Sequence, residues 1–280
     1  MKLLTAFIQQ NAPADSTLMQ KVQQTVQDDG NWIMHHIADK PVLVLPPIHI
    51  GGFTLDMSIS MKILMLIIAA VLMVILFGYA AASNKKRKHP TGLGNFLEML
   101  MVFVRDDVVK PSMGHGADKY LPFFFTMFFF ILFVNVISLF PGMSTGTSSI
   151  SVTAGLALIT FIMTQIHGIK HNGFVGYFKG LIPPGVPVFV LPIMVIIEFL
   201  GLLTKPFALA IRLFANMTAG HIVIYALIGL IFMLGYAVIP VSIAFTLFIY
   251  VLEILVAVLQ AYIFTMLSAL FIGMAIHQDH

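Results

Sequence analysis

The sequence predicts an all-α polytopic membrane protein with about five membrane helices and one surface amphipathic helix. The last two membrane helices are predicted to be long, tilted and packed as a hairpin. Of the 280 residues, 59% are hydrophobic and only 10% are charged, whereas soluble domains carry about 25% charged residues. Several apolar segments also reach the roughly 20 residues that a membrane crossing needs. The net charge of +3 comes from Lys and Arg beside apolar segments, where they report orientation, so no nucleic-acid partner is expected.

The N-terminal residues 1–56 are polar and mixed, and we expect them to form an extramembrane arm ahead of a membrane domain of residues 57–280. The first span is predicted at about residues 57–82, where Lys62 near the start is the single charge. The basic run Lys85-Lys86-Arg87-Lys88 follows at once. The positive-inside rule places that end in the cytoplasm and the N-terminus outside.

A helix lying on the inner membrane surface is predicted at about residues 93–110. Polar Glu98, Arg105 and Asp106 interrupt one side of this segment. Apolar residues recur at helical spacing on the other side, namely Leu93, Phe96, Leu97, Leu100, Val104 and Val108. Such a division favours a helix in the interface plane.

Two further spans are predicted at about residues 120–140 and 150–169. Asn135 and Ser138 lie near the outer end of the first of them. The second brings Lys170 back to the basic, cytoplasmic side. The charges therefore agree with the orientation assigned to the first span.

The remaining apolar sequence is too long for upright spans, and we predict helices at about residues 188–234 and 241–276. A single helix over residues 191–234 would be about 66 Å long, twice the hydrocarbon thickness. Two half-length segments broken at Pro206 are the alternative, because proline interrupts helices. Two long antiparallel helices joined by a turn at residues 235–240 satisfy both lengths and return the C-terminus to the cytoplasm.

Arg212 lies within this apolar sequence, far from either end of its segment. A guanidinium keeps its proton in proteins, and at a helix centre it costs about 2.5–3.5 kcal/mol even on the lenient insertion scale. Glu198 and Asn216 each fall about 40° from Arg212 on an ideal helix, so the three share a face. His221 falls about 180° away. Intramembrane ionisable residues are functional by default, which makes Arg212 the first candidate for a site.

The last predicted helix carries Glu253 and Gln260, seven residues apart and on one face, about 10 Å along the axis. A fixed cation, two carboxylates, a histidine and two amides at membrane depth suit proton transfer through hydrated cavities. Asn216 and Gln260 also suit a structural role as polar contacts between helices. A buried carboxylate without function is expensive, which argues against a structural role for Glu253.

Two motifs are similar to those of a known family. They are the stretch from Lys205-Pro206 to Gly220, with its core Arg212-Leu213-Phe214-Ala215-Asn216-Met217, and the stretch Leu259-Gln260-Ala261-Tyr262-Ile263-Phe264. Together with the order of spans over about residues 57–276, they resemble subunit a of the bacterial F-type ATP synthases. The resemblance implies a multi-pass subunit of the cell inner membrane that forms the stator half of the ion path. Its implied partners are the ring of subunit c, the peripheral stalk of subunit b, the rest of the synthase and the lipid bilayer.

The resemblance also implies roles for individual residues. Arg212 matches the essential arginine, with Asn216 and Gln260 as its polar neighbours. Glu198 matches the carboxylate of the inner half-channel. His221 and Glu253 match the outer half-channel pair, with the two residue types exchanged relative to the commonest bacterial form.

The outer half-channel carries a second departure from the family pattern. Ser138 stands where many relatives have Asp, and Ser149 and Ser151 replace polar or acidic residues at the start of the next span. We therefore expect hydroxyls rather than carboxylates to line part of this route.

Other functions are less well supported by the sequence. It carries no GxxxxGK[ST] loop, so ATP chemistry is assigned to other subunits and the chain is not expected to be an enzyme. It has no Cys, and the scattered His35, His36 and His49 suggest solvated loop residues, so neither a cofactor nor a metal site is expected. A secondary transporter would show internal repeats, and a metalloprotease would show an H-E-x-x-H motif. The sequence has neither feature, which argues against both functions. A sodium-translocating version of the same subunit is the serious alternative, because the coupling ion is chosen largely by subunit c.

Overall fold

The described part of the protein is helical apart from two short antiparallel β-pairs. Five helices are long and apolar enough to cross a membrane, which confirms the predicted all-α polytopic fold. The chain divides into two compact units, one made of Asp39–Gly220 with Tyr250–His280 and the other containing His221–Ile249. The computed structural model describes residues 41–43, 48–50, 53–55, 58–85, 92–114, 116–140, 146–180, 189–235 and 238–277.

The first helix begins four residues later than predicted, because residues just before it are taken up in a β-pair. Strand β1 (Pro41–Leu43) pairs with β4 (Ile59–Ser60), so the predicted start at residue 57 is wrong and α3 spans Met61–Lys85. The Ser60 hydroxyl accepts a hydrogen bond from the Ile63 backbone N–H, as an N-cap does.

The other pair joins β2 (Ile48–Ile50) to β3 (Phe53–Leu55). Residues 1–40 of the predicted extramembrane arm lie outside the described residues, so the location of the arm stays a prediction.

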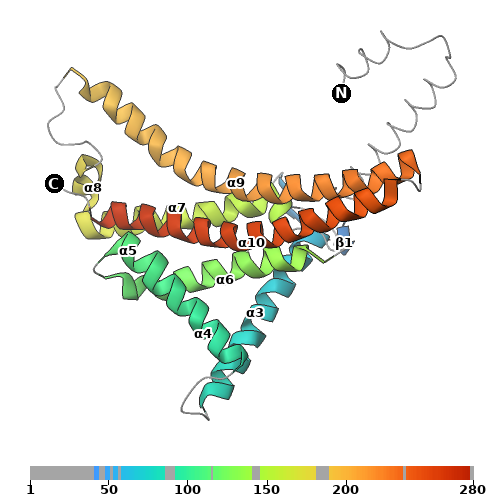
Figure 1. The fold of residues 1–280 in the computed structure, drawn as a ribbon. Helices are drawn as coiled ribbons and strands as arrows, with labels where there is room; N and C mark the ends of the chain where they lie inside the picture. Colours follow the sequence, from blue (N-terminus) through green and yellow to red (C-terminus); the bar gives the residue numbers. More distant parts are fainter. Residues whose placement is uncertain are drawn as a thin grey trace, which may run out of the picture. The chain divides into compact units, whose positions relative to one another are not determined.

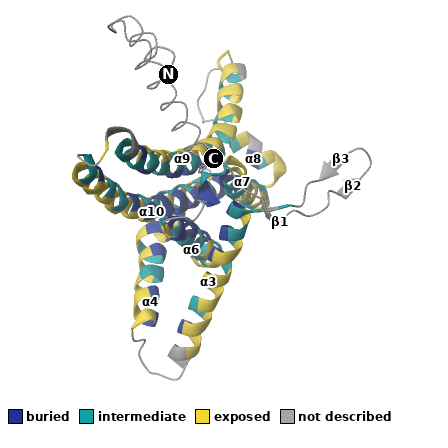
Figure 2. Cartoon of the chain, turned by 90° about the vertical axis from the view of Figure 1, so that its right-hand side faces the viewer, coloured by how far each residue is buried: buried dark blue, intermediate teal, exposed yellow. Residues whose placement is uncertain are grey.

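Helix α6 (Leu121–Ser138) is the most buried of the long helices, and α3 packs against it. Met65 and Ala69 of α3 are buried together with Val134 and Ile137 of α6. Figure 2 shows the contrast, since α6 is largely dark blue whereas α3 exposes much of its length. An apolar helix with an exposed face is suited to lipid contact.

The predicted surface helix is longer than expected, and only some of its apolar residues are buried. Helix α4 (Leu93–Phe103) continues through a π-helical stretch (Val104–Val109) into α5 (Lys110–Met113), three residues beyond the predicted end. Leu97 is buried, as are Val104 and Val108 in the π-helical stretch, but Leu93 and Phe96 are exposed. Only part of the predicted apolar face therefore packs against protein.

An ion-pair cluster covers the polar side of this π-helical stretch. Arg105 approaches Asp106 at 2.8 Å and Lys110 approaches it at 2.9 Å. Hydrogen bonds from these two cations hold the pKa of the Asp106 carboxyl well below its usual range. The carboxylate therefore stays ionised at any pH the membrane meets.

Helices α6, α7 (Ile150–Asn172) and the C-terminal part of α10 (Ile239–Ile276) lie side by side (Figure 1). Their contact includes hydroxyls in an otherwise apolar core, since Thr160 Oγ1 of α7 lies 3.3 Å from Ser268 Oγ of α10 and 3.6 Å from the sulfur of Met127 in α6. Helix α7 ends at Asn172, three residues beyond the predicted end of this span at residue 169.

Helix α9 (Leu191–Leu234) is one continuous helix of 44 residues with Pro206 inside it. The alternative of two half-length segments is therefore wrong. Together with the 38 residues of α10, it forms the predicted antiparallel hairpin. Within the smaller unit, the Ser242 hydroxyl of α10 donates to the Leu227 carbonyl of α9.

The C-terminal end of α10 is tied to its neighbours through polar contacts. Asn172 Nδ2 donates to the carbonyl of Ala275 at 2.9 Å, and His277 Nε2 lies 3.0 Å from the carbonyl of Met113. Gly273 lies directly against the backbone carbonyl of Ser112. A helix end leaves its last carbonyls unsatisfied, and Asn172 supplies a donor to them.

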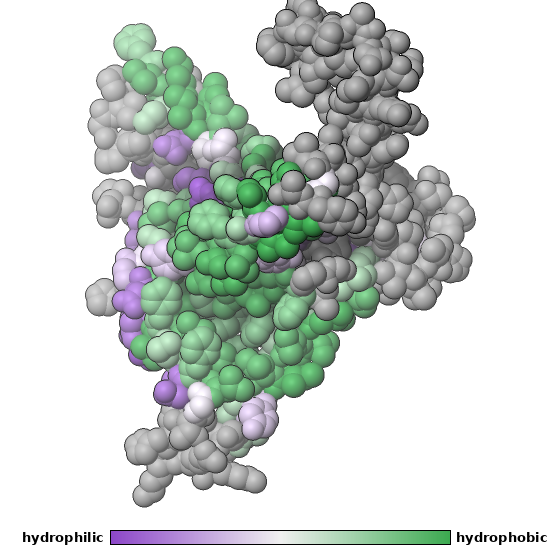
Figure 3. All heavy atoms as spheres, turned by 45° about the vertical axis from the view of Figure 1, so that its right-hand side comes forward, coloured by the Kyte–Doolittle hydropathy of each residue, from purple (hydrophilic) through white to green (hydrophobic). Residues whose placement is uncertain are grey.

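The exposed surface of the described residues is largely apolar. Figure 3 shows mostly hydrophobic side chains on the face in view, with hydrophilic ones gathered along one edge. Soluble monomers rarely expose apolar areas of this extent, so this surface fits a membrane protein.

Candidate functional site

One face of α9 carries the predicted polar residues. Successive positions 198, 202, 205, 209, 212 and 216 are separated by four or three residues, which keeps them on one side of the helix. Glu198 and Arg212 are half-buried, and Leu209 between them is fully buried. The two charged groups therefore lie on the same face that packs, in part, against the protein.

A hydrogen bond joins α9 to α10 one turn beyond Arg212. Asn216 Nδ2 donates to Gln260 Oε1 at 3.0 Å, and the Gln260 side chain is 2% exposed. The structure thus brings together the two amides that the sequence singled out. An amide pair of this kind fixes the register of the two helices beside Arg212.

Glu253 of α10 is buried, 5% exposed, and lies against Gly220 of α9. A Cβ atom at position 220 would overlap the Glu253 carboxylate. The absence of a side chain at Gly220 therefore makes room for an acidic group at membrane depth. Sequence reasoning missed this role, although Gly220 ends the motif that begins at Lys205.

Arg212 has no carboxylate within salt-bridge distance in the described part of the chain. Asp106, by contrast, forms ion pairs with Arg105 and Lys110. Buried or membrane-embedded charges are normally paired. Among the described residues, Arg212 is therefore a half-buried cation without a carboxylate partner.

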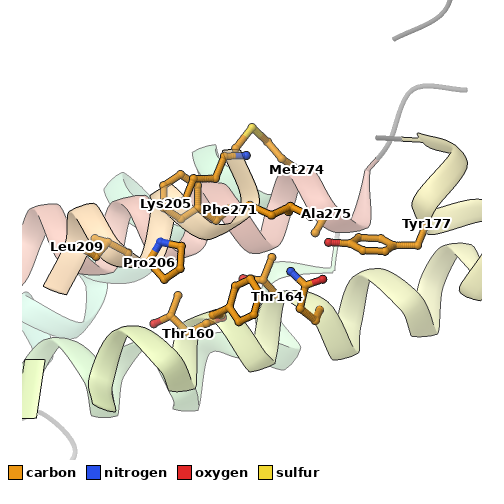
Figure 4. A pocket seen from close by; sticks show the side chains of 12 residues that line it. Thr160, Thr164, Tyr177, Lys205, Pro206, Leu209, Phe271, Met274 and Ala275 are labelled. Atoms are coloured by element: carbon orange, nitrogen blue, oxygen red, sulfur yellow. The ribbon is translucent and has the colours of Figure 1, made fainter. Parts of the chain in front are cut away.

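A cavity of about 70 Å³ lies along the α9 face between Glu198 and Arg212. This volume is enough for several water molecules. Figure 4 shows Lys205 and Pro206 on one side of it and Thr160 and Thr164 on the other. Its lining is Thr160, Phe161, Thr164, Gln165, Tyr177, Leu202, Lys205, Pro206, Leu209, Phe271, Met274 and Ala275.

Two cavity residues hold their side chains by specific contacts. The Lys205 ammonium lies 5.5 Å from the centre of the Phe271 ring, a cation–π contact. Tyr177 belongs to α8 (Phe174–Gly180), is 1% exposed and packs closely on Gly168. Burial raises the pKa of the Tyr177 hydroxyl, although a hydrogen bond with Gln165 lowers it in part. The hydroxyl therefore remains protonated at neutral pH and points into the cavity (Figure 4).

Pro206 adds a backbone acceptor to the cavity wall. Proline has no N–H, so the carbonyl of Leu202, four residues earlier, receives no helical hydrogen bond from it. Leu202 and Pro206 both line the cavity. Water in the cavity would satisfy such a carbonyl, which is one way a helix continues through proline.

Comparison with known proteins places this architecture in a family. Residues 63–273 match the model of the family described as ATP synthase A chain. The chain belongs to the ATP synthase A chain family.

Its relatives are bacterial. The chain is 50% identical to ATP synthase subunit a of Chloroherpeton thalassium over 88% of this chain and 77% of that one. It is 47% identical to ATP synthase subunit a 2 of Chlorobaculum tepidum, over 89% and 74% of the two chains. It is also 48% identical to ATP synthase subunit a of Myxococcus xanthus, over 81% and 77%.

In this member of the ATP synthase A chain family, His221 belongs to the smaller unit. The side chain is half-buried, and its ring centroid lies 6.5 Å from that of Tyr225, one helical turn further on. Glu253 belongs to the larger unit. The pairing of His221 with Glu253 therefore stays a prediction.

Hydroxyl and amide groups form a buried cluster near the C-terminal end of α6. Thr147 Oγ1 donates to Asn135 Oδ1 at 3.0 Å, and Ser138 Oγ donates to the Asn135 carbonyl at 2.6 Å. Asn135 is 0% exposed and Ser138 is 3% exposed. Ser149 takes the N-cap position of α7 and Ser151 is exposed. Of the three serines singled out from the sequence, Ser138 therefore belongs to this cluster, and the lining of the outer half-channel by hydroxyls stays a prediction.

No cluster of metal-ligating side chains occurs among the residues that the structure describes. His35 and His36 lie outside those residues.

Proposed function

We propose that this chain is the proton-translocating stator subunit of a rotary ATP synthase, with Arg212 facing the carboxylates of a subunit c ring. As a member of the ATP synthase A chain family, it belongs to the membrane sector of the enzyme. A sodium-translocating version is the alternative. The single observation that carries the proposal is a half-buried arginine at membrane depth whose counter-charge is not supplied by the described part of the chain.

Arg212 acts electrostatically in this mechanism. A ring carboxylate that loses its proton becomes an anion in a low-dielectric medium, and the fixed guanidinium offsets much of that cost. The same positive charge repels protons, so it blocks a direct leak between the two half-channels. Rotation of the ring is then the path left for the ion. Each proton that crosses releases about 2.3 kcal/mol per 100 mV of membrane potential.

The outer half-channel is assigned to Glu253 and His221. Support comes from the burial of Glu253 in a site that Gly220 keeps open. A carboxylate and a histidine exchange protons near neutral pH, which suits delivery of a proton to the ring. The cluster around Asn135 supplies additional polar groups for the approach from outside.

The inner half-channel is assigned to Glu198 and the cavity that follows it along α9. Support comes from the polar groups that Lys205, Tyr177 and Thr164 contribute to the otherwise mostly apolar lining of that cavity. The Leu202 carbonyl beside Pro206 offers a further acceptor for water. A chain of water molecules held by such groups conducts protons released near Arg212 toward the cytoplasm.

The remaining parts of the proposal concern the complex. The chain itself is non-catalytic, and ATP chemistry takes place on other subunits. Besides the ring, we propose subunit b of the peripheral stalk as a partner and the bacterial inner membrane as the location. The N-terminus lies outside and the C-terminus in the cytoplasm.

The test is ATP-driven proton pumping by the assembled enzyme in inverted membrane vesicles. Arg212→Ala should abolish pumping and raise passive proton permeability, because both roles depend on the charge. Arg212→Lys should also lose most pumping, since an ammonium lacks the planar fork of the guanidinium. Lys110→Gln, which removes an exposed cation, is the matched control and should pump normally. Near-normal coupling in Arg212→Ala would refute the assignment.

The same vesicles distinguish the coupling ion. Pumping that continues unchanged when sodium is left out supports proton translocation. Pumping that requires sodium, or is accelerated by it, favours the alternative.

A further inference from the structure

A second cavity, away from the Arg212 site, is lined by lysine and histidine side chains. It has a volume of about 460 Å³ and lies where the short helix Ala117–Tyr120, the end of α7 and the end of α10 meet. Its lining is Met113, Gly116, Lys119, Tyr120, His167, Lys170, His171, Ile276 and His277. Two lysines and three histidines are among these nine residues, and no carboxylate is.

Two of the histidines are held in fixed orientations. His167 Nδ1 lies 2.8 Å from the Met163 carbonyl, and His277 Nε2 lies 3.0 Å from the Met113 carbonyl. Because a carbonyl only accepts, each of these ring nitrogens must carry the hydrogen. The other nitrogen of a neutral ring is an acceptor, so the lysines supply the donors to an anion in this cavity. The ring of Tyr120 packs edge-on against His167 at 4.8 Å, which further restrains it.

Two lysine ammonium groups in a lining without a carboxylate favour an anionic ligand. Like charges at close range are unfavourable, and the carboxylate nearest in sequence, Asp118, does not line the cavity. Ammonium groups are donors without acceptor capacity, which matches an oxygen-rich anion such as phosphate.

The exposed surface of α7 beside the cavity favours a phospholipid over free phosphate. Leu158, Ile162 and Ile166 are exposed and follow one another at intervals of four residues, and Lys170 is the next position in that row. Residues four apart form a ridge on a helix. An apolar ridge that ends at a basic cavity has the layout of a phospholipid, with acyl chains beside the ridge and the headgroup in the cavity.

We propose that this cavity binds the phosphate headgroup of an anionic phospholipid, with its acyl chains along the exposed ridge of α7. Basic cavities between membrane helices bind anionic headgroups in this way. The site is independent of the ion path, since none of its residues belongs to the proposed half-channels. It holds the lipid against α7 and α10 at the end of the bundle where both helices finish.

The test uses the intact synthase complex in detergent micelles that contain phosphatidylcholine and increasing fractions of phosphatidylglycerol. The phosphatidylglycerol that stays with the purified complex is counted by mass spectrometry. Each lysine near a headgroup contributes about 1 kcal/mol, or roughly a fivefold change in affinity. The double variant Lys119→Gln, Lys170→Gln should therefore need about thirtyfold more phosphatidylglycerol for half-occupancy.

Three comparisons make the result specific. Lys119→Arg with Lys170→Arg keeps both charges and should bind as the parent does. Lys110→Gln with Lys179→Gln removes two exposed cations outside the cavity and should also bind normally. Equal retention of phosphatidylglycerol in the Lys119/Lys170 glutamine variant, or equal loss in the Lys110/Lys179 control, would overturn the proposal. Displacement of the lipid by inorganic phosphate at matched concentration would assign the cavity to a free anion and overturn it as well.

Discussion

At the residue scale, the charged side chain of Glu253 packs against the backbone of Gly220, which has no side chain. The Glu253 carboxylate occupies the volume that a Cβ at position 220 would fill. The atom concerned is the far end of a side chain, so the carboxylate rather than the backbone would have to move. An added methyl group at position 220 therefore tests whether pumping depends on the position of the Glu253 carboxylate.

Gly220→Ala should reduce ATP-driven pumping by about tenfold to a hundredfold, because a displacement of about 1 Å at a reacting group has effects of that size. The amount of assembled complex should change little. Gly201→Ala is the matched control in the same helix, since its Cβ would meet no atom within 4 Å. Equal pumping by the two variants would mean that the position of Glu253 is unimportant.

His221 and Glu253 are predicted to act as one proton-accepting pair. Glu253→His leaves two bases and His221→Glu leaves two carboxylates, so each single change should impair pumping. The double exchange restores one group of each kind and should recover a substantial part of the activity. Losses that simply add in the double variant would show that the two residues work independently.

At the element scale, the lengths of α9 and α10 followed from apolar sequence alone. A run of 44 residues exceeds any upright crossing of the membrane, and the 38 residues of α10 do so as well. The face shared by Glu198, Arg212 and Asn216 followed from helical periodicity in the same way.

Other features depend on contacts that a sequence does not display. Continuity through Pro206 requires neighbouring groups or water to take up the Leu202 carbonyl, and propensity alone favours a break. The π-helical stretch Val104–Val109 is selected by packing on α6, not by a local motif. The sequence around Tyr177 does not indicate its position in the cavity either, because that position arises from packing on Gly168 in another helix.

The close approach of α10 to α5 gives an element-scale prediction. A Cβ on Gly273 would overlap the backbone carbonyl of Ser112, which cannot rotate away. Gly273→Ala should therefore destabilise the packed subunit by about 1–3 kcal/mol or more. Gly155→Ala places its methyl group in open space and should be neutral or stabilising by up to about 1 kcal/mol. The temperature of half-inactivation of the complex in detergent measures both, and equal values would contradict the packing argument.

At the scale of the whole molecule, the five membrane-capable helices found among the described residues support the proposal that the two ends of the chain lie on opposite sides of the membrane. The absence of Cys makes this testable, because an introduced Cys is the sole thiol of the subunit. Cys at Ser16 or Asp56, which lie outside the described residues, should react with an impermeant maleimide added to intact cells. Cys at Asn84 or Lys179 should react only after the membrane is made permeable. Outside labelling at Asn84 would invert the proposed orientation.

The anchoring of the end of α10 has a mechanical consequence. In the proposed mechanism, a ring turning against the α9 and α10 hairpin would exert a lateral force on it, and the hairpin would resist that force only if it is held in place. Asn172 and His277 bond the last turn of α10 to α7 and α5, and Gly273 seats it on the backbone at Ser112. A lateral force on the hairpin would therefore be transmitted at this end to α7 and α5. These contacts would keep the end of α10 in place while the proposed ring moves past it.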